Sequence, residues 1–212
     1  MRAAVLAAGQ VRDYDRIRLA VGVPDLVICA DGGLRHALAL GLMPDLIVGD
    51  FDSSDPSLLA EVKARGIPVR RVPVEKDQTD TQLALEEALA RGAGEILLVG
   101  ATGSRVDHTV SNLLLLPAIA DRAEVALVDG NNIVRLLRPG CRLTVQAVPG
   151  TYLSLLPLTP EVTGVVAQGV KWPLNGAVLR WGESLGVSNE ILGETALVAV
   201  EQGYLLVVQA WD

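Results

Sequence analysis

The stretch LIVGDFDSS, residues 46–54, is an apolar run that ends abruptly in two aspartates, Asp50 and Asp52. The apolar residues predict a buried strand, and an acidic turn directly after it is typical of an open parallel sheet, where ligands bind beyond the carboxyl ends of the strands. Between the aspartates stands Phe51, the only phenylalanine of the chain. If the backbone stays extended here, side chains alternate, so we expect Phe51 to be buried while both carboxylates face one cleft.

Two carboxylates placed this close together repel each other and call for a neutralising partner. On an extended segment their Cα atoms lie roughly 7 Å apart. A hard divalent cation relieves the repulsion, and Mg²⁺ suits the site best, because it takes few carboxylates and completes its shell with water and phosphate oxygens. A single aspartate after a strand reads more readily as a turn residue. Two aspartates at this spacing favour the metal site.

Around this stretch, strand-like and helical runs alternate as far as Asp129, which predicts an α/β domain with a mostly parallel, Rossmann-like sheet. The strands are expected at residues 3–8, 26–30, 46–48, 69–72, 96–99 and 125–128. The helices are expected at residues 34–42, 56–65, 80–91 and 107–120.

The rest of the chain has a different texture, with short apolar runs separated by Gly or Pro and no helical period. Strands are expected at residues 143–148, 152–156, 162–166, 177–181, 196–200 and 204–210. This pattern predicts an all-β sandwich domain. We therefore divide the chain into an α/β domain, residues 1–132, and a β-sandwich domain, residues 133–212.

Composition excludes several classes of protein. The 212 residues include 18 Lys plus Arg against 25 Asp plus Glu, a net charge of −7, and no basic run, which argues against a nucleic-acid partner. The longest apolar segment, residues 113–120, is too short to span a membrane. The N-terminus lacks a secretory pattern, so a cytoplasmic location is expected. Cys29 and Cys141 stand apart among apolar neighbours and are expected to be reduced.

Three more junctions should converge with residues 49–54 at the same sheet edge: ADGG at 30–33, EKDQTD at 75–80 and GATGSRVDH at 100–108. Asp31 fits a helix cap as well as a ligand. Lys76 offers a cation for phosphate, and Thr79 or Asp77 caps the next helix. Asp80 in the first helical turn has the alternative role of a partner for the helix dipole.

The glycine-rich junction gives a weaker signal. Gly100, Gly103 and Arg105 are placed to cradle phosphate. Asp55 before a proline fits a helix cap rather than a ligand. His36 is expected on the exposed side of its helix.

With these stretches in view, the sequence resembles the thiamine pyrophosphokinase family, whose members convert thiamine and ATP to thiamine diphosphate and AMP. The resemblance rests on ADGG, PDLIVGDFDSS, EKDQTDTQLAL and GSRVDHTVSN in the family's order, followed by GVKWPL and SLGVSNE. It spans nearly the whole chain. Two departures stand on the nucleotide side, Leu34-Arg35 after the glycines and GSR at residues 103–105.

The resemblance implies a Mg²⁺-dependent homodimer whose active site is shared between subunits, with ATP and thiamine as substrates. It implies that the catalytic, metal-binding carboxylates are Asp50, Asp52 and Asp80, with Asp31 close by. It places ATP beside Lys76, Asp77, Gln78, Thr79, Gly103, Arg105, Asp107 and His108. It places thiamine beside Trp172, Ser188 and Asn189.

Two further classes compete with this interpretation. Asp50-Phe51-Asp52 followed by Ser54 imitates the nucleophile motif of haloacid-dehalogenase-like phosphatases, in which Asp50 would become an aspartyl-phosphate. That motif here follows the third strand rather than the first. A non-catalytic nucleotide sensor is the other alternative. For the kinase, the general base stays open between Asp107 and a metal-bound carboxylate.

Overall fold

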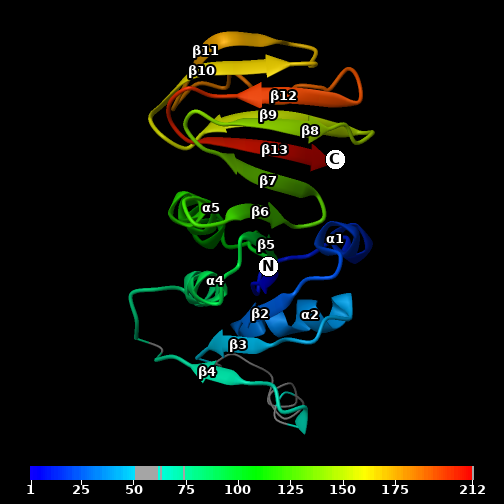
Figure 1. Ribbon diagram of the computed structural model, residues 1–212, viewed down its shortest axis with the longest axis vertical. Helices are drawn as coiled ribbons and strands as arrows, with labels where there is room; N and C mark the ends of the chain where they lie inside the picture. Colours follow the sequence, from blue (N-terminus) through cyan, green and yellow to red (C-terminus); the bar gives the residue numbers. More distant parts are fainter. Residues whose placement is uncertain (51–61, 63, 74, 212) are drawn as a thin grey trace. The chain divides into compact units, whose positions relative to one another are not determined.

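The computed structural model describes residues 1–50, 62, 64–73 and 75–211. The chain divides into two compact units, Met1–Gly130 and Asn131–Asp212. The expected fold class is confirmed, because the first unit holds a parallel sheet with helices and the second holds antiparallel sheets (Figure 1). Phe51, Asp52 and Asp55, and most of the helix expected at residues 56–65, lie outside the described residues.

The first unit alternates strands and helices along the chain. Its strands are β1 (Arg2–Leu6), β2 (Leu26–Ala30), β3 (Leu46–Gly49), β4 (Val69–Arg71), β5 (Glu95–Val99) and β6 (Glu124–Val128). Its helices are α1 (Tyr14–Val21), α2 (Leu34–Leu40), α4 (Asp80–Ala90) and α5 (Val106–Ala120), with a short 3-10 helix, η1 (Asp31–Gly33), leading into α2.

The sheet of this unit is parallel throughout, in the order β4-β3-β2-β1-β5-β6. From β1 the chain first builds outward through β2, β3 and β4, and then returns to place β5 on the other side of β1. The strand order therefore reverses between β1 and β5, and such a reversal opens a crevice at the carboxyl ends of the two strands.

Helices cover both faces of the parallel sheet. Figure 1 shows α4 and α5 on one side and α1 and α2 on the other. The central strands are almost fully buried, as expected for strands covered on both faces. Helix α1 was not expected from the sequence. It begins with Asp13 as its cap, whose carboxylate accepts a hydrogen bond from the Arg16 main-chain nitrogen at 2.9 Å.

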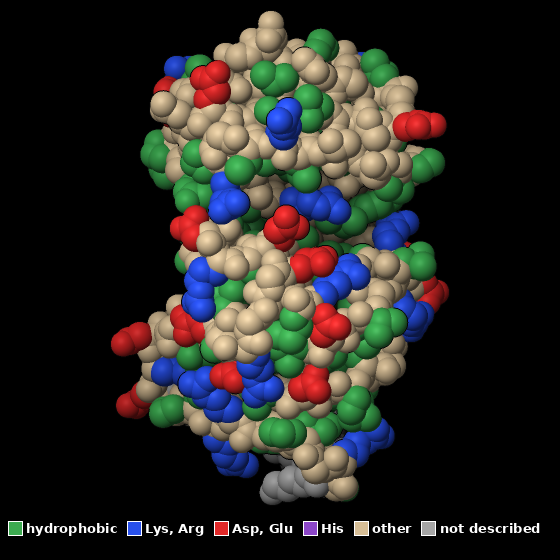
Figure 2. All heavy atoms as spheres, viewed as in Figure 1, with side chains coloured by type: hydrophobic (Ala, Val, Ile, Leu, Met, Phe, Trp, Pro, Cys, Tyr) green, Lys and Arg blue, Asp and Glu red, His purple; other side chains and the backbone are tan. Residues whose placement is uncertain are grey.

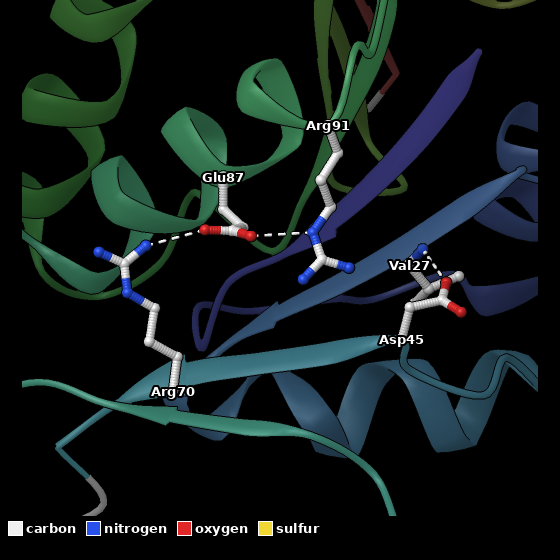
Figure 3. Close-up of polar contacts among 5 residues, drawn as sticks. All are labelled: Val27, Asp45, Arg70, Glu87 and Arg91. Carbon is white, nitrogen blue, oxygen red and sulfur yellow. Dashed lines mark hydrogen bonds and ion pairs between the residues drawn. The ribbon is translucent and has the colours of Figure 1, made fainter.

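Two acidic side chains tie the outer part of this sheet to its neighbours (Figure 3). Glu87 on α4 accepts hydrogen bonds from Arg70 of β4 and from Arg91, both at 2.8 Å. Asp45, just before β3, accepts one from the main-chain nitrogen of Val27 in β2, also at 2.8 Å. These contacts join β4 to α4 and the start of β3 to β2.

The second unit is antiparallel throughout its described strand pairs. Its strands are β7 (Asn132–Leu137), β8 (Arg142–Gln146), β9 (Thr151–Pro157), β10 (Glu161–Gln168), β11 (Leu174–Arg180), β12 (Thr195–Ala199) and β13 (Leu205–Trp211). Strands β7, β13 and β9 pair in that order, and β11, β10, β12 and β8 form a four-stranded sheet. Buried residues from both groups, among them Leu153, Val165 and Val198, form one apolar core. This core between two sheets is that of a β-sandwich.

Charged side chains are unevenly distributed on the face that Figure 2 shows. Figure 2 shows acidic and basic side chains intermingled over the α/β unit on the face in view, and few charges over the sandwich unit. No continuous basic stripe crosses that face. Among the described residues, none of the helices has both the length and the apolar character needed to cross a membrane.

Candidate active site

A cavity of about 380 Å³ lies in the first unit at the reversal between β1 and β5. Its walls come from the segments that follow β1, β2 and β5 and from the starts of α4 and α5. The lining residues include Gly9, Gln10, Asp31, Arg35, Thr79, Asp80, Gly103, Arg105, His108 and Asn112. Junctions far apart in the sequence are thus brought to one place, as the sheet topology predicts.

Close main-chain contact shapes the floor of this cavity. Beyond the ends of β1 and β5, the Gly9 nitrogen donates to the Gly100 carbonyl and the Gln10 nitrogen to the Thr102 carbonyl, both at 2.7 Å. A Cβ at residue 9 would lie only 2.2 Å from the Thr102 carbonyl oxygen. Only glycine therefore allows the two segments to approach so closely.

Side-chain hydrogen bonds hold the loop after β5, residues 100–105, which lines the cavity. Thr102 donates a hydrogen bond to Asp129 at 2.7 Å, and the buried amide of Asn112 donates to the Ala101 carbonyl, also at 2.7 Å. The Gly103 nitrogen donates to the Thr109 hydroxyl at 3.3 Å. The sequence interpretation did not single out Asn112 or Thr109, although both lie in the GSRVDHTVSN motif.

Asp50, directly after β3, and Asp80, the first residue of α4, form an acid cluster around the Lys76 ammonium. The Lys76 ammonium lies 3.1 Å from Asp80 and 3.5 Å from Asp50, and all three side chains are less than a quarter exposed. Burial raises the pKa of Asp80, Lys76 opposes this, and the charges of Asp50 and Asp31 add to it. Burial lowers the pKa of Lys76, but the two carboxylates outweigh it, so the net shift is upward.

The donor chemistry of this cluster fits a hard cation. The buried Oδ1 of Asp80 accepts no aligned hydrogen bond from the described part of the chain, although it lies close to the Lys76 ammonium. The described residues alone do not place three acidic, histidine or cysteine side chains around one point, and Asp52 is outside them. What fits a divalent ion is the donor type, because Asp50 and Asp80 offer carboxylate oxygens, the ligands that a hard cation prefers.

The start of α4 shows which residue caps the helix and which expected ATP-binding residues lie outside the cavity. Thr79 caps the helix, because its hydroxyl accepts from the Gln82 nitrogen at 3.2 Å. The Gln78 amide donates to Glu86 at 2.7 Å. Neither Lys76 nor Asp77 nor Gln78 lines the cavity.

Arg105 and Asp107 form an exposed pair at the start of α5. Two guanidinium nitrogens of Arg105 meet the Asp107 carboxylate, at 3.0 Å and 2.5 Å. This hydrogen-bonded pairing holds the pKa of Asp107 far below its usual range. Arg105 lines the cavity, whereas Asp107 does not.

His36 contradicts the expectation that it is exposed. Its side chain is 3% exposed. Its Nδ1 lies 2.7 Å from the Tyr14 hydroxyl and its Nε2 lies 2.9 Å from the Gly9 carbonyl oxygen. These two contacts fit a neutral ring that accepts from Tyr14 and donates to Gly9. The imidazole therefore holds the main chain at Gly9, which lines the cavity.

His36 should make stability depend on pH. Burial lowers its pKa below the ordinary 6.5, and nearby Arg35 lowers it further, against the opposing Gly9 hydrogen bond. Below about pH 6.5 the unfolded chain takes up a proton that the folded chain resists, so the free energy of unfolding should fall by up to about 1.4 kcal/mol per pH unit. Urea denaturation at pH 7.5, 6.5 and 5.5 measures this. His36→Gln should flatten the dependence; an equally steep fall in the variant would contradict the assignment.

In the second unit, the three expected ligand residues lie together. The Trp172 side chain is 55% exposed, with the Lys171 ammonium 4.7 Å from its ring centroid. The buried Asn189 amide accepts from the Trp172 nitrogen at 3.1 Å and donates to the Trp172 carbonyl at 2.8 Å. Ser188 has a φ of 59° and its nitrogen donates to Ser154. Asn189 thus fixes the main chain that carries the Trp172 ring.

These features define a two-domain protein in which an α/β unit has a cavity at its strand reversal and a β-sandwich unit presents an exposed aromatic ring. Residues 20–127 match the family described as thiamin pyrophosphokinase, catalytic domain, and residues 141–205 match thiamin pyrophosphokinase, vitamin B1 binding domain. The chain belongs to the thiamin pyrophosphokinase family.

Individual relatives match most or all of the chain. The thiamine pyrophosphokinase of Bacillus subtilis is 29% identical over 188 residues, covering 88% of each protein. The crystal structure of a thiamin pyrophosphokinase family protein from Enterococcus faecalis is 31% identical, with a TM-score of 0.83 and full coverage of both chains. That of thiamin pyrophosphokinase from Geobacillus thermodenitrificans is 28% identical, with a TM-score of 0.87, covering 100% of this chain and 98% of the other.

Proposed function

We propose that this protein transfers the pyrophosphoryl group of ATP to the hydroxyethyl oxygen of thiamine, giving thiamine diphosphate and AMP. The observation that carries the proposal is the cavity at the β1/β5 reversal, bordered by Asp31 and Asp80, in a chain whose two halves match the two domains of one family. No feature of the described residues favours the phosphatase or the sensor over this activity.

In this proposal the α/β unit binds ATP and Mg²⁺. Asp50 and Asp80, together with Asp52 from the sequence, hold the ion, and Asp31 lies close by. When bound, Mg²⁺ neutralises charge on the phosphates. The cavity residues Thr79, Gly103, Arg105 and His108 contact ATP, whereas Lys76, Asp77, Gln78 and Asp107, which the resemblance also assigns to ATP, do not line the cavity.

The reaction is an in-line displacement at the β-phosphorus. The thiamine oxygen forms a bond to that phosphorus as the bond to the oxygen of the α-phosphate breaks, and AMP leaves. Positioning and charge neutralisation supply most of the catalysis. Asp107 is the poorer of the two bases considered, because it is exposed, paired with Arg105 and has a lowered pKa. A carboxylate of the acid cluster is therefore the better candidate to receive the hydroxyl proton.

Thiamine binds to the sandwich unit in this proposal, with its cationic ring system against the Trp172 side chain. The exposure of the Trp172 ring supports the assignment, because an indole face attracts a cation, and thiamine would take the place of the Lys171 ammonium over that ring. Ser188 and Asn189 complete the site. We further propose a cytoplasmic homodimer in which the Asp80 cluster of one protomer acts with Trp172 of its partner.

One incubation tests the activity. Purified protein with ATP, Mg²⁺ and thiamine should release AMP and thiamine diphosphate in equal amounts, and should release neither when thiamine or Mg²⁺ is omitted. Ion-exchange chromatography of the quenched mixture measures both products. Release of inorganic phosphate that does not depend on thiamine would instead indicate the phosphatase, and an absence of turnover would leave the sensor.

A further inference from the structure

The cavity in the α/β unit is lined by a positively charged residue, Arg35, that the family resemblance did not assign to ATP binding. Arg35 and Arg105 both line it. Arg105 is paired with Asp107. Arg35 meets no carboxylate within ion-pair distance among residues 1–50, 62, 64–73 and 75–211, so its charge is not neutralised by the described protein.

The fold places Arg35 at the cavity wall through a close approach of backbones. A Cβ at Gly33 would lie 1.9 Å from the Leu6 carbonyl oxygen, so only glycine lets the start of α2 pack directly on the end of β1. Arg35 follows two residues later. Its Nη2 then reaches the main-chain carbonyls of Ala8 and Gly9, the second at 2.9 Å.

These contacts fix the guanidinium and leave donors unused. Both carbonyls accept from Nη2. The two N–H groups of Nη1 have no partner in the part of the chain that the structure describes. A guanidinium keeps its charge at any working pH, and its planar edge suits phosphate oxygens. The side chain is thus held by neutral acceptors while its charge and two donors stay available.

The rest of the cavity identifies the anion. Asp31 and Asp80 line the same space and repel a bare anion, whereas a polyphosphate arrives with its own divalent ion. The ion would bind the Asp31 and Asp80 carboxylates, and the Arg35 side chain would neutralise phosphate charge that the ion leaves uncompensated. A nucleoside triphosphate meets both requirements, and a nucleoside or monophosphate meets them poorly.

We propose that Arg35 binds the β,γ-phosphates of the nucleotide and makes binding depend on phosphate number. The assignment rests on the proposed function for the identity of the cavity's ligand. It makes Arg35 a substrate-binding residue that discriminates ATP from AMP, the reaction product.

The test is a series of dissociation constants for ATP, ADP and AMP, measured by calorimetry with Mg²⁺ present. Arg35→Gln should weaken ATP roughly 10- to 100-fold, the range for a lost charge-assisted contact, and leave AMP within about twofold. Arg35→Lys should recover part of the loss, because it restores the charge without the planar fork. Arg91→Gln is the matched control, since Arg91 pairs with Glu87 and does not line the cavity. It should change none of the three constants.

Two results would overturn the proposal. Equal weakening of ATP, ADP and AMP by Arg35→Gln would mean that the side chain only holds the Ala8–Gly9 wall in place. Unchanged ATP affinity in both Arg35 variants would remove it from binding altogether. A different measurement would contradict the proposed activity: an unmutated protein that binds ATP but forms no thiamine diphosphate. Even then, the dissociation constants of ATP, ADP and AMP would decide the role of Arg35.

Discussion

Asp80→Asn should lower kcat on the order of 100-fold or more while the protein remains folded. The exchange keeps the shape of the side chain and removes one charged ligand from the proposed Mg²⁺ site. Because burial and the neighbouring carboxylates already oppose the charge of Asp80, the metal-free protein should lose little stability with it. Asp50→Asn should behave in the same way, since Asp50 shares Lys76 with Asp80.

Steady-state AMP formation and thermal unfolding with and without Mg²⁺ check this prediction. Adding Mg²⁺ should raise the Tm of the unmutated protein and leave that of Asp80→Asn nearly unchanged. Glu87→Gln is the matched control, because Glu87 lies on the same helix but pairs with Arg70 and Arg91 away from the cavity (Figure 3). Its kcat should stay near normal. Near-normal turnover by Asp80→Asn at saturating Mg²⁺ would disprove the metal assignment.

Mixing two inactive variants should restore activity if the site is shared between protomers. Asp80→Asn removes the acid cluster and Trp172→Ala removes the exposed ring, so each homodimer should be nearly inactive. When equal amounts are unfolded and refolded together, random pairing makes about half of the dimers mixed. Each mixed dimer has one intact and one doubly damaged site, so activity should recover to roughly a quarter of the unmutated level.

Among the residues expected to contact thiamine, Trp172 is the best one to change in this experiment. The Trp172 ring is largely exposed, whereas the Asn189 amide is buried and bonds the main chain at Trp172, so its loss would disturb the fold. The control is a mixture of Asp80→Asn with Asp50→Asn, which should stay inactive because both changes lie in the same cluster. An Asp80→Asn and Trp172→Ala mixture that stays inactive, although mixed dimers form, would place both residues in one chain's site.

The amino-acid pattern predicts the fold class and most of the junctions that line the cavity. Strands such as β2 and β5 are continuous apolar runs, which are typical of parallel strands buried on both faces. The carboxyl ends of parallel strands share one edge, which is why Asp31, Asp80 and Gly103 were predicted to converge and do line one cavity. The sequence pattern does not predict helix α1, because only Ile17 and Val21 of its residues are buried, which is too few to give a helical repeat of apolar positions.

Tertiary structure alone decided the environment of individual side chains. His36 is buried because Tyr14 and the Gly9 carbonyl, 22 and 27 residues away, pack against its ring. Arg35 faces the cavity because Gly33 lets α2 settle on β1. Lys76 lies between Asp50 and Asp80 rather than on the cavity wall. Periodicity reports which face of an element is apolar, whereas a hydrogen-bond partner or a missing counter-charge depends on segments that only the folded chain brings together.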